Sequence, residues 1–402
     1  MRAASETGTA VHRIQKLLVV SHVVHYQRGD RIYAYGPYAR EIDIWADLFP
    51  RLAIASPVRS GDPPGDCIPF SRSNIELVPQ RETGGTTASA KLRQLLAVPS
   101  LLLGLGRAMA SADAIHVRCP GNLGLLGVIL APLFSQYIVA KYTSAWAGYP
   151  TEPWTWRLQR ALLRSFWWRG PVTVYGGTSN QSENVISFFT SVLNEKQLAR
   201  AGSAASKAKV NDPMRLLYVG RLSVGKNVDV LISAVAALKS QGIASTCMIV
   251  GEGPQRPALE AQIAAFGLRD YVELVGGVSL DCVLDYYERA DICVLVSESE
   301  GWGKATAEAM AFGLICIGSN QGFALEMLGE GRGICVPPGD VSALTAVLCA
   351  IAARPEAYES MRREAAAWAS RYSLQGLQNS LRELLRIHWK WEAGGLERRP
   401  QV

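Results

Sequence analysis

Several signals that mark metal-dependent, disulfide-stabilised or nucleic-acid-binding proteins are missing from this sequence. No Asp-x-Asp pair occurs in its 402 residues, so a metal-bridged diphosphate would lack its usual ligands. The eight cysteines form no Cys-x-x-Cys pair and have no histidine at ligand spacing, which favours reduced thiols in the cytosol. Charged residues make up only 19%, and the formal net charge of +6 is mild for a nucleic-acid-binding protein. We therefore expect no metal and no nucleic-acid partner.

Signals for export and for membrane insertion are also scarce. The first residues, MRAASETGTAVHRIQK, lack an apolar segment, so we expect no signal peptide. The uncharged run from Gly121 to Ala140 could be either a membrane span or a buried helix followed by a strand. Pro132 and the pair Ser135 and Gln136 divide that run, which favours a buried helix followed by a strand. The expected location is the cytoplasm, either free or at the inner face of the membrane.

The sequence does contain a regular alternation of strand-like and helix-like segments. Continuous Val/Ile/Leu strands joined by helices indicate parallel sheets covered on both faces, and the chain is long enough for two such domains. The strand candidates are KLLVVS (16–21), LAIAS (52–56), IELVP (75–79), AIHVR (114–118), YIVAKY (137–142), VTVYG (172–176), RLLYVG (215–220), TCMIVG (246–251), YVELVG (271–276), ICVLVS (292–297), LICIGS (314–319) and GICVP (333–337). The predicted fold class is α/β, with two Rossmann-like domains facing a central cleft.

A small, polar segment suggests where the first domain ends. AGSAASKAKVNDP, residues 201–213, has the composition of a linker. We predict an N-terminal acceptor-binding domain over residues 1–205 and a C-terminal nucleotide-sugar-binding domain over residues 206–379. The terminal helix, about 380–402, is expected to cross back to the first domain.

The stretch ESEGWGKATAEAMAFG, from Glu298 to Gly313, carries the most specific chemistry. Glu300 and Glu308 are separated by seven residues, after a strand and around the start of a helix that ends near Gly313. In open parallel sheets, ligands gather at the carboxyl ends of strands, where this stretch lies. A carboxylate accepts hydrogen bonds from neighbouring hydroxyls, so glutamates suit ribose and hexose recognition. The alternative is a charge at the helix start and a second charge on a solvated helical face.

Three further loops are expected at the same cleft. In YVGRLSVGKN, Gly220 permits close backbone approach, and Arg221 and Lys226 suit a diphosphate; two solvated surface charges are the alternative. The other two loops are glycine turns, IVGEGP with Gly251 and Gly253, and QRGDRIYAYGPYAR with Gly36 before a helix start.

Together these segments resemble the retaining, nucleotide-sugar-dependent glycosyltransferases of the GT-B fold (group 1, or family 4-like). The carriers are YVGRLSVGKN, IVGEGP, VELVGGV, ESEGWGKATAEAMAFG and GICVPPGD. The resemblance implies that Arg221 and Lys226 hold the donor diphosphate, that Glu300 contacts the transferred sugar and that Glu308 binds the ribose. It also implies contacts from the backbone amides of the four residues that follow Glu300, which are Gly301, Trp302, Gly303 and Lys304.

The same resemblance gives an expected reaction. A sugar moves from a nucleotide-diphosphate sugar to a glycan or lipid-linked acceptor with retention of configuration and without a metal, in polysaccharide or glycoconjugate biosynthesis. No cofactor is needed, since the nucleotide sugar is a substrate. Two alternatives stay open: a nucleotide-sugar epimerase of the same fold, and a non-catalytic nucleotide-sugar-binding protein.

Two segments leave roles undecided. Many members of the resembled family carry a histidine-rich strand end, whereas this chain has His116 and Arg118 on one face of the strand in DAIHVRCPGN. Both are candidate catalytic residues; Arg118 contacts either the donor, an anionic acceptor or a structural carboxylate. WTWRLQRALLRSFWWRG, residues 154–170, is either a membrane-interface segment or an amphipathic helix packed on the first sheet.

Overall fold

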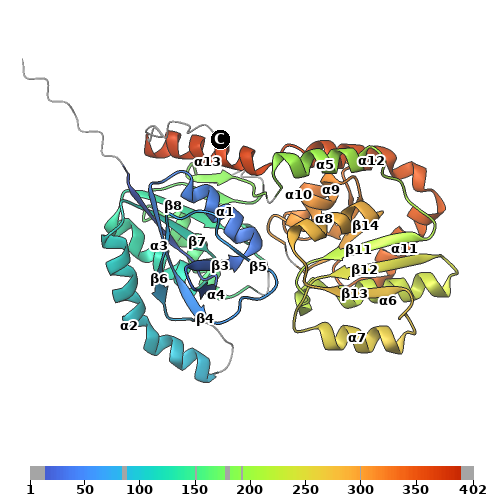
Figure 1. The fold of residues 1–402 in the computed structure, drawn as a ribbon, viewed down its shortest axis with the longest axis horizontal. Coiled ribbons are helices and arrows are strands. Elements are labelled where there is room, and N and C mark those ends of the chain that lie inside the picture. The colour runs from blue at the N-terminus through green and yellow to red at the C-terminus, as the bar shows by residue number, and fades with distance from the viewer. Residues whose placement is uncertain are drawn as a thin grey trace, which may run out of the picture.

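The computed structural model describes residues 14–83, 88–149, 152–176, 182–191, 193–298 and 300–390. Two α/β domains lie side by side, each built on its own largely parallel sheet (Figure 1). The α/β fold class with two Rossmann-like domains is confirmed. Each predicted strand is present in one of the two sheets.

The first sheet has the order β10-β9-β8-β7-β1-β4, with β6 paired to β4, and all of these pairings are parallel. Most residues of these strands are apolar, as expected of a sheet covered on both faces. Their bounds are β1 (Lys16–Val20), β4 (Arg51–Ser60), β6 (Ile75–Gln80), β7 (Ala114–Cys119), β8 (Tyr137–Tyr142), β9 (Val172–Val174) and β10 (Val185–Ser187). A smaller antiparallel extension of the sheet comprises β2 (His25–Arg28), β3 (Arg31–Tyr35) and β5 (Cys67–Pro69). Residues 27–40, which contain β3, were predicted to be a loop.

Helices cover both faces of this sheet. One face packs against α2 (Ala88–Ala110), α3 (Asn122–Phe134) and α4 (Trp154–Arg164), and the other against α1 (Gly36–Ala46) and α13 (Leu374–Trp389). The uncharged run Gly121–Ala140 forms α3 and β8, as the buried-unit interpretation predicts. Within the described ranges, no helix combines the length and the apolar character that crossing a bilayer requires.

The second sheet is parallel throughout, with the order β13-β12-β11-β14-β15-β16. Its strands are β11 (Met214–Val219), β12 (Ser245–Val250), β13 (Val272–Gly276), β14 (Ile292–Leu295), β15 (Ile315–Ser319) and β16 (Ile334–Val336). The helices of this domain are α5 (Glu195–Ala205), α6 (Val228–Ser240), α7 (Arg256–Ala265), α8 (Leu280–Arg289), α9 (Lys304–Ala311), α10 (Ala324–Leu328), α11 (Val341–Ala353) and α12 (Glu359–Ala369), with the 3₁₀ turns η1 (Val224–Lys226) and η2 (Pro355–Tyr358).

The domain crossing lies earlier in the chain than the predicted boundary at residue 205. Leu193 and Ala201 are buried in the core of the second domain, so α5 belongs there. A capping box between Asn194 and Gln197 begins this helix, and its last turn takes up the start of the polar segment interpreted as a linker. The chain therefore crosses between β10 and α5.

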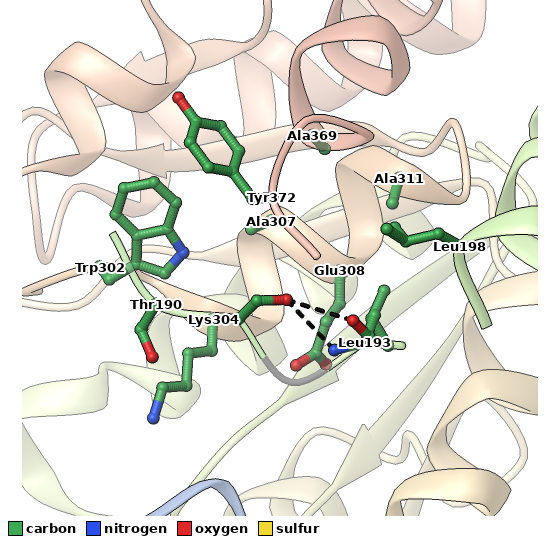
Figure 2. Close-up of a pocket in the computed structure, with 11 residues that line it drawn as sticks. Thr190, Leu193, Leu198, Trp302, Lys304, Ala307, Glu308, Ala311, Ala369 and Tyr372 are labelled. Carbon is green, nitrogen blue, oxygen red and sulfur yellow. Dashed lines mark hydrogen bonds between the residues drawn. The ribbon is translucent and has the colours of Figure 1, made fainter. Parts of the chain in front are cut away.

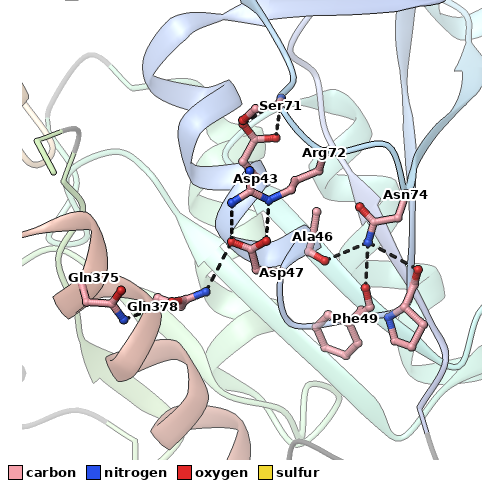
Figure 3. A network of polar contacts seen from close by, with 10 residues as sticks. Asp43, Ala46, Asp47, Phe49, Ser71, Arg72, Asn74, Gln375 and Gln378 are labelled. Carbon is pink, nitrogen blue, oxygen red and sulfur yellow. Dashed lines mark hydrogen bonds and ion pairs between the residues drawn. The ribbon is translucent and has the colours of Figure 1, made fainter. Parts of the chain in front are cut away.

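The return crossing matches the expectation of a terminal helix on the first domain. Figure 1 shows α13, in red, lying against that domain, and Leu377 and Leu385 are fully buried in its core. The polar network in Figure 3 adds a link, because Gln378 Nε2 donates to Asp47 Oδ2 at 3.5 Å while Arg72 pairs with the same carboxylate. The helix begins at residue 374 rather than about 380; residues 391–402 lie outside the described part.

Candidate functional site

Two loops at the carboxyl end of the second sheet are bonded to each other. They follow the neighbouring strands β11 and β14. The backbone N–H of Glu298 donates to the carbonyl of Gly225 at 2.9 Å, and Asn227 Nδ2 donates to the carbonyl of Val296 at 2.9 Å. Asn227 has a left-handed backbone (φ 51°), which ends η1 and starts α6. These bonds place the two predicted donor motifs next to each other.

Lys226 and Glu300 form an ion pair across these loops. Ser297 Oγ donates to the same oxygen of Glu300 at 2.9 Å. The side chains of Lys226 and Glu300 are 27% and 19% exposed, so both are held in place yet open to a ligand. The interpretation of Lys226 as a solvated surface charge does not fit this arrangement.

Arg221 begins the same loop and is exposed. The hydroxyl of Tyr218 donates to the backbone carbonyl of Arg221 at 3.0 Å, which fixes the backbone of the loop at Arg221. Tyr35, at the end of β3 in the first domain, lies close enough to Arg221 to interact with its charge. Burial, and then the negative charges of Glu308, Asp66 and Glu300, raise its pKa to about 12, while Arg221 opposes them.

Glu308 is buried rather than solvated, with 7% of the residue exposed. The hydroxyl of Tyr287 donates to its Oε2 at 2.8 Å. Burial raises the pKa of Glu308 to about 7, against the opposing effects of Tyr287, Lys304 and Arg40. Figure 2 shows Lys304 and Glu308 lining one pocket with Thr190, from the segment between the domains. Tyr287 thus engages one carboxylate oxygen of Glu308. The alternative interpretation, a charge on a solvated helical face, does not fit this buried position.

Gly251 and Gly253, which were predicted to contact the donor, lie where the β12–α7 turn packs against the loop after β11. A Cβ on Gly251 would lie 1.9 Å from the carbonyl oxygen of Gly220, and one on Gly253 would lie 2.2 Å from that of Leu222. The N–H of Leu222 also donates to the carbonyl of Glu252 at 2.9 Å. The β12–α7 turn therefore supports the Arg221 loop from behind, and this packing alone explains both glycines.

The residues after Glu300 differ in role. A Cβ on Gly301 would lie 2.6 Å from the Thr143 carbonyl oxygen in the first domain, so the domains touch there. Gly303 has a left-handed backbone (φ +42°) and directly precedes α9. The first hydrogen bond of that helix runs from the N–H of Ala307 to the carbonyl of Gly303 at 3.0 Å. The amides of residues 304–306 precede this bond in the first turn of α9, where helix geometry leaves N–H groups that can meet an anion.

The side chain of Trp302, in contrast, is part of the core. It is 5% exposed and packs against the rings of Phe323 (5.0 Å between centroids), Trp368 (5.8 Å) and Tyr372 (4.9 Å). The side chain of Trp302 is therefore not available to a ligand, and the contact of its backbone with the donor stays a prediction.

The predicted residues of the first domain are less available. The N–H of Gly36 already donates to the carbonyl of Asp66 at 2.8 Å. His116 is fully buried and packs on Trp45 at 4.5 Å between ring centroids; burial and the charge of Arg118 lower its pKa well below the usual value. Within the described residues neither ring nitrogen of His116 has a hydrogen-bond partner. This position favours a packing role over a catalytic one.

Arg118 pairs with a structural carboxylate, one of the alternatives left open for it. Its Nη1 lies 2.6 Å from Glu41 Oε1, and Lys141 Nζ lies 2.9 Å from Glu41 Oε2. Thr190 Oγ1 donates to Glu41 Oε2 at 3.4 Å. Burial would raise the pKa of Glu41, but Arg118, Lys141 and Lys304 hold it well below its usual value. We call Glu41, Arg118 and Lys141 the Glu41 cluster.

Sequence reasoning missed Glu41, Lys141 and Tyr287. The available signal was a lysine inside the apolar strand YIVAKY and a glutamate on the buried face of α1, because buried charges need partners. Tyr287 had no comparable signal. Within the described ranges, no group of three or more His, Cys, Asp or Glu side chains is placed to hold a metal ion.

Comparisons with known proteins bear on both the family and the fold. The family model "Glycosyl transferases group 1" matches residues 200–368. The second domain is a group 1 glycosyltransferase domain. The resemblance to group 1 glycosyltransferases, stated from the sequence motifs, is confirmed for this domain.

Curated relatives of this group 1 domain match part of the chain. An alpha-D-kanosaminyltransferase from Streptomyces kanamyceticus is 30% identical over 190 residues, which are 47% of this chain and 49% of that protein. The amylovoran biosynthesis glycosyltransferase AmsK from Erwinia amylovora is 35% identical over 146 residues, which are 35% of this chain and 36% of that protein. The match thus spans half or less of these relatives.

Solved structures match this chain over nearly its whole length and show the GT-B fold. A sucrose-phosphate synthase from Thermosynechococcus elongatus has a TM-score of 0.70 at 19% identity, covering 94% of this chain and 99% of that one. Anabaena HepE in complex with UDP and glucose has a TM-score of 0.66 at 16% identity, covering 92% and 99%.

Proposed function

We propose that this chain transfers a sugar from a nucleotide-diphosphate sugar to a glycan or lipid-linked acceptor, with retention of configuration and without a metal. The observation that carries the proposal is the Lys226–Glu300 ion pair beside Arg221, at the carboxyl end of a sheet in a group 1 glycosyltransferase domain. The HepE complex with UDP and glucose supports the donor class, and the name of AmsK supports a role in polysaccharide or glycoconjugate biosynthesis.

Different loops of the second domain bind different parts of the donor. Arg221 and Lys226 neutralise the diphosphate, aided by the amides at the start of α9. Glu308 accepts hydrogen bonds from the ribose through the oxygen that Tyr287 does not engage. Glu300, released from Lys226 when the diphosphate takes that lysine, accepts hydrogen bonds from the transferred sugar.

The chemistry follows from this placement. Charge grows on the leaving diphosphate in the transition state, and preorganised cations and amides stabilise it more than the bound donor. The acceptor attacks from the leaving-group side, and a phosphate oxygen takes its proton, so no protein nucleophile is needed. The reaction takes place in the cytoplasm, or at the inner face of the membrane when the acceptor is lipid-linked.

The test is a transfer assay with excess chelator. A panel of nucleotide sugars is incubated with glycan and lipid-linked acceptors, and the anomeric configuration of the product is read by NMR. Transfer with retention in chelator is expected. Transfer that stops in chelator and returns with magnesium or manganese would contradict the metal-free mechanism. Free epimerised nucleotide sugar, or donor binding with no turnover over the whole panel, would favour an epimerase or a binding protein.

A further inference from the structure

Three helices form one continuous layer on the first domain. Their inward side chains share a single core, and α3 contacts both α2 and α4. Their remaining side chains consequently point away from the sheet on one side of the domain. In Figure 1, α2 and α3 run along the outer edge of this domain, away from the second domain.

Large apolar side chains are exposed on this layer. On α2 they follow a helical stripe at spacings of four and seven residues: Leu92 (58% exposed), Leu96 (70%) and Leu103 (62%). The other helices and the turn after α4 add Ile129 (37%), Leu133 (64%), Phe134 (40%), Trp154 (72%), Leu158 (37%) and Phe166 (88%). Single exposed apolar residues are normal, but such a concentration marks an interaction surface.

The charge of the layer is of one sign. The sequences of these three helices contain no Asp or Glu, and their charged residues are Lys91, Arg93, Arg107, Arg157, Arg160 and Arg164. Arg157 and Arg160 both pair with Glu152, which lies just before α4, whereas Arg107 and Arg164 are exposed. The helices on the opposite face of the sheet mix both signs, for example Arg382 and Glu383 on α13. Leucines and aromatics flanked by arginines suit the boundary between acyl chains and anionic headgroups.

We propose that the layer of α2, α3 and α4 docks on an anionic lipid bilayer. The segment Trp154–Gly170 supplies only one border of this surface, and the leucine stripe of α2 supplies its longest part. A second copy of this chain is a poorer occupant, because a two-fold contact through the layer would bring its exposed arginines, Arg107 and Arg164, toward those of the other copy with no exposed acidic side chain on these helices to pair with them. The inference deepens the proposed lipid-linked acceptor.

The test is flotation of the full chain with vesicles, which needs no donor or acceptor. Failure here is therefore distinguishable from failure of the transfer assay. Phosphatidylcholine vesicles are compared with vesicles that contain about one third phosphatidylglycerol. The wild-type chain is expected to float with the anionic vesicles, and salt should weaken this binding. The double variant Leu96→Glu, Leu103→Glu should bind at least about tenfold more weakly.

A matched control carries the same substitutions elsewhere on the molecule. Ile387 on α13 is 58% exposed and Leu325 on α10 is 52% exposed, so Ile387→Glu, Leu325→Glu changes charge and apolarity equally away from the layer. This control should float like the wild type. Absence of wild-type flotation, equal loss in both double variants, or a dimer in light scattering that Leu96→Glu, Leu103→Glu dissociates would each overturn the proposal.

Discussion

At the scale of single residues, the Lys226–Glu300 pair shows how the site is held before a ligand arrives. Each side chain neutralises the other, and both stay partly exposed. A bound diphosphate offers Lys226 a stronger anionic partner, and a sugar hydroxyl offers Glu300 a donor. The ion pair therefore preorganises two binding groups and is exchanged for ligand contacts.

Replacement of Lys226 by alanine should reduce turnover by about two to three orders of magnitude, because a cation on the leaving diphosphate is lost. The fold should persist, since the lysine lies in a partly exposed turn. Lys207→Ala, at an exposed lysine after α5, is the matched control and should keep normal turnover. Steady-state kinetics on folded variants decide the matter.

The ion pair complicates that experiment, because Lys226→Ala also leaves Glu300 without its partner. The double variant Lys226→Ala, Glu300→Gln separates the effects. If the two residues act as a unit, the double variant should lose little more than the worse single variant. Near-normal turnover in Lys226→Ala would return this lysine to a surface-charge role.

At the scale of helices and strands, most of the architecture could be predicted because apolar runs and helix signals agree. The strand ICVLVS, the glycine-containing turn and the helix ending near Gly313 all appear where expected. The antiparallel extension β2–β3–β5 could not be predicted in this way. Its strands are only three to five residues long, and their burial does not alternate cleanly, so they carry no core pattern.

The site was predictable where a motif lies within one loop and not where partners come from distant elements. Glu300 and Lys226 are named by their motifs, but their contact depends on the pairing of β11 with β14. Glu41 and Lys141 meet only in the folded domain. The glycines of the β12–α7 turn were predicted as donor contacts, and the structure supplies a packing reason for them.

The packing role of Gly253 predicts a stability loss. Gly253→Ala would force a Cβ to 2.2 Å from the Leu222 carbonyl, so the Arg221 loop must shift. We expect a loss of roughly 1–3 kcal/mol and weaker nucleotide binding. Gly202→Ala is the control: this position in α5 has nothing within 4 Å of the added Cβ and should be stabilised by about 0.5–1 kcal/mol. Equal melting curves for the two variants would contradict the packing account.

At the scale of the whole molecule, the Glu41 cluster lies where the domains meet. Glu41 is 1% exposed and neutralises Arg118 and Lys141, while Lys304 of the second domain acts on the same carboxylate. Thr190, in the segment between the domains, contacts it as well. One carboxylate thus compensates several cations, in a region where unpaired charges are costly.

Glu41→Gln should therefore lower the free energy of unfolding by about 3–5 kcal/mol, because it leaves Arg118 and Lys141 buried without a counter-charge. Calorimetric melting measures the effect. Glu383→Gln removes an exposed, solvent-screened ion pair with Arg386 on α13 and should leave the melting temperature nearly unchanged. A Glu41→Gln variant as stable as Glu383→Gln would show that the cluster is not a stabilising centre.

The proposed transfer depends on one placement of the donor: the loops of the second domain hold a nucleotide-diphosphate sugar, with Glu308 on the ribose and Glu300 on the transferred sugar. Titration calorimetry of Glu300→Gln and Glu308→Gln, with a nucleoside diphosphate and with its sugar conjugate, tests this most directly. Glu308→Gln should weaken both ligands, since both contain ribose. Glu300→Gln should spare the sugar-free ligand and weaken only the conjugate. If Glu300→Gln weakens the nucleoside diphosphate as much as Glu308→Gln does, the proposed placement of the donor is contradicted.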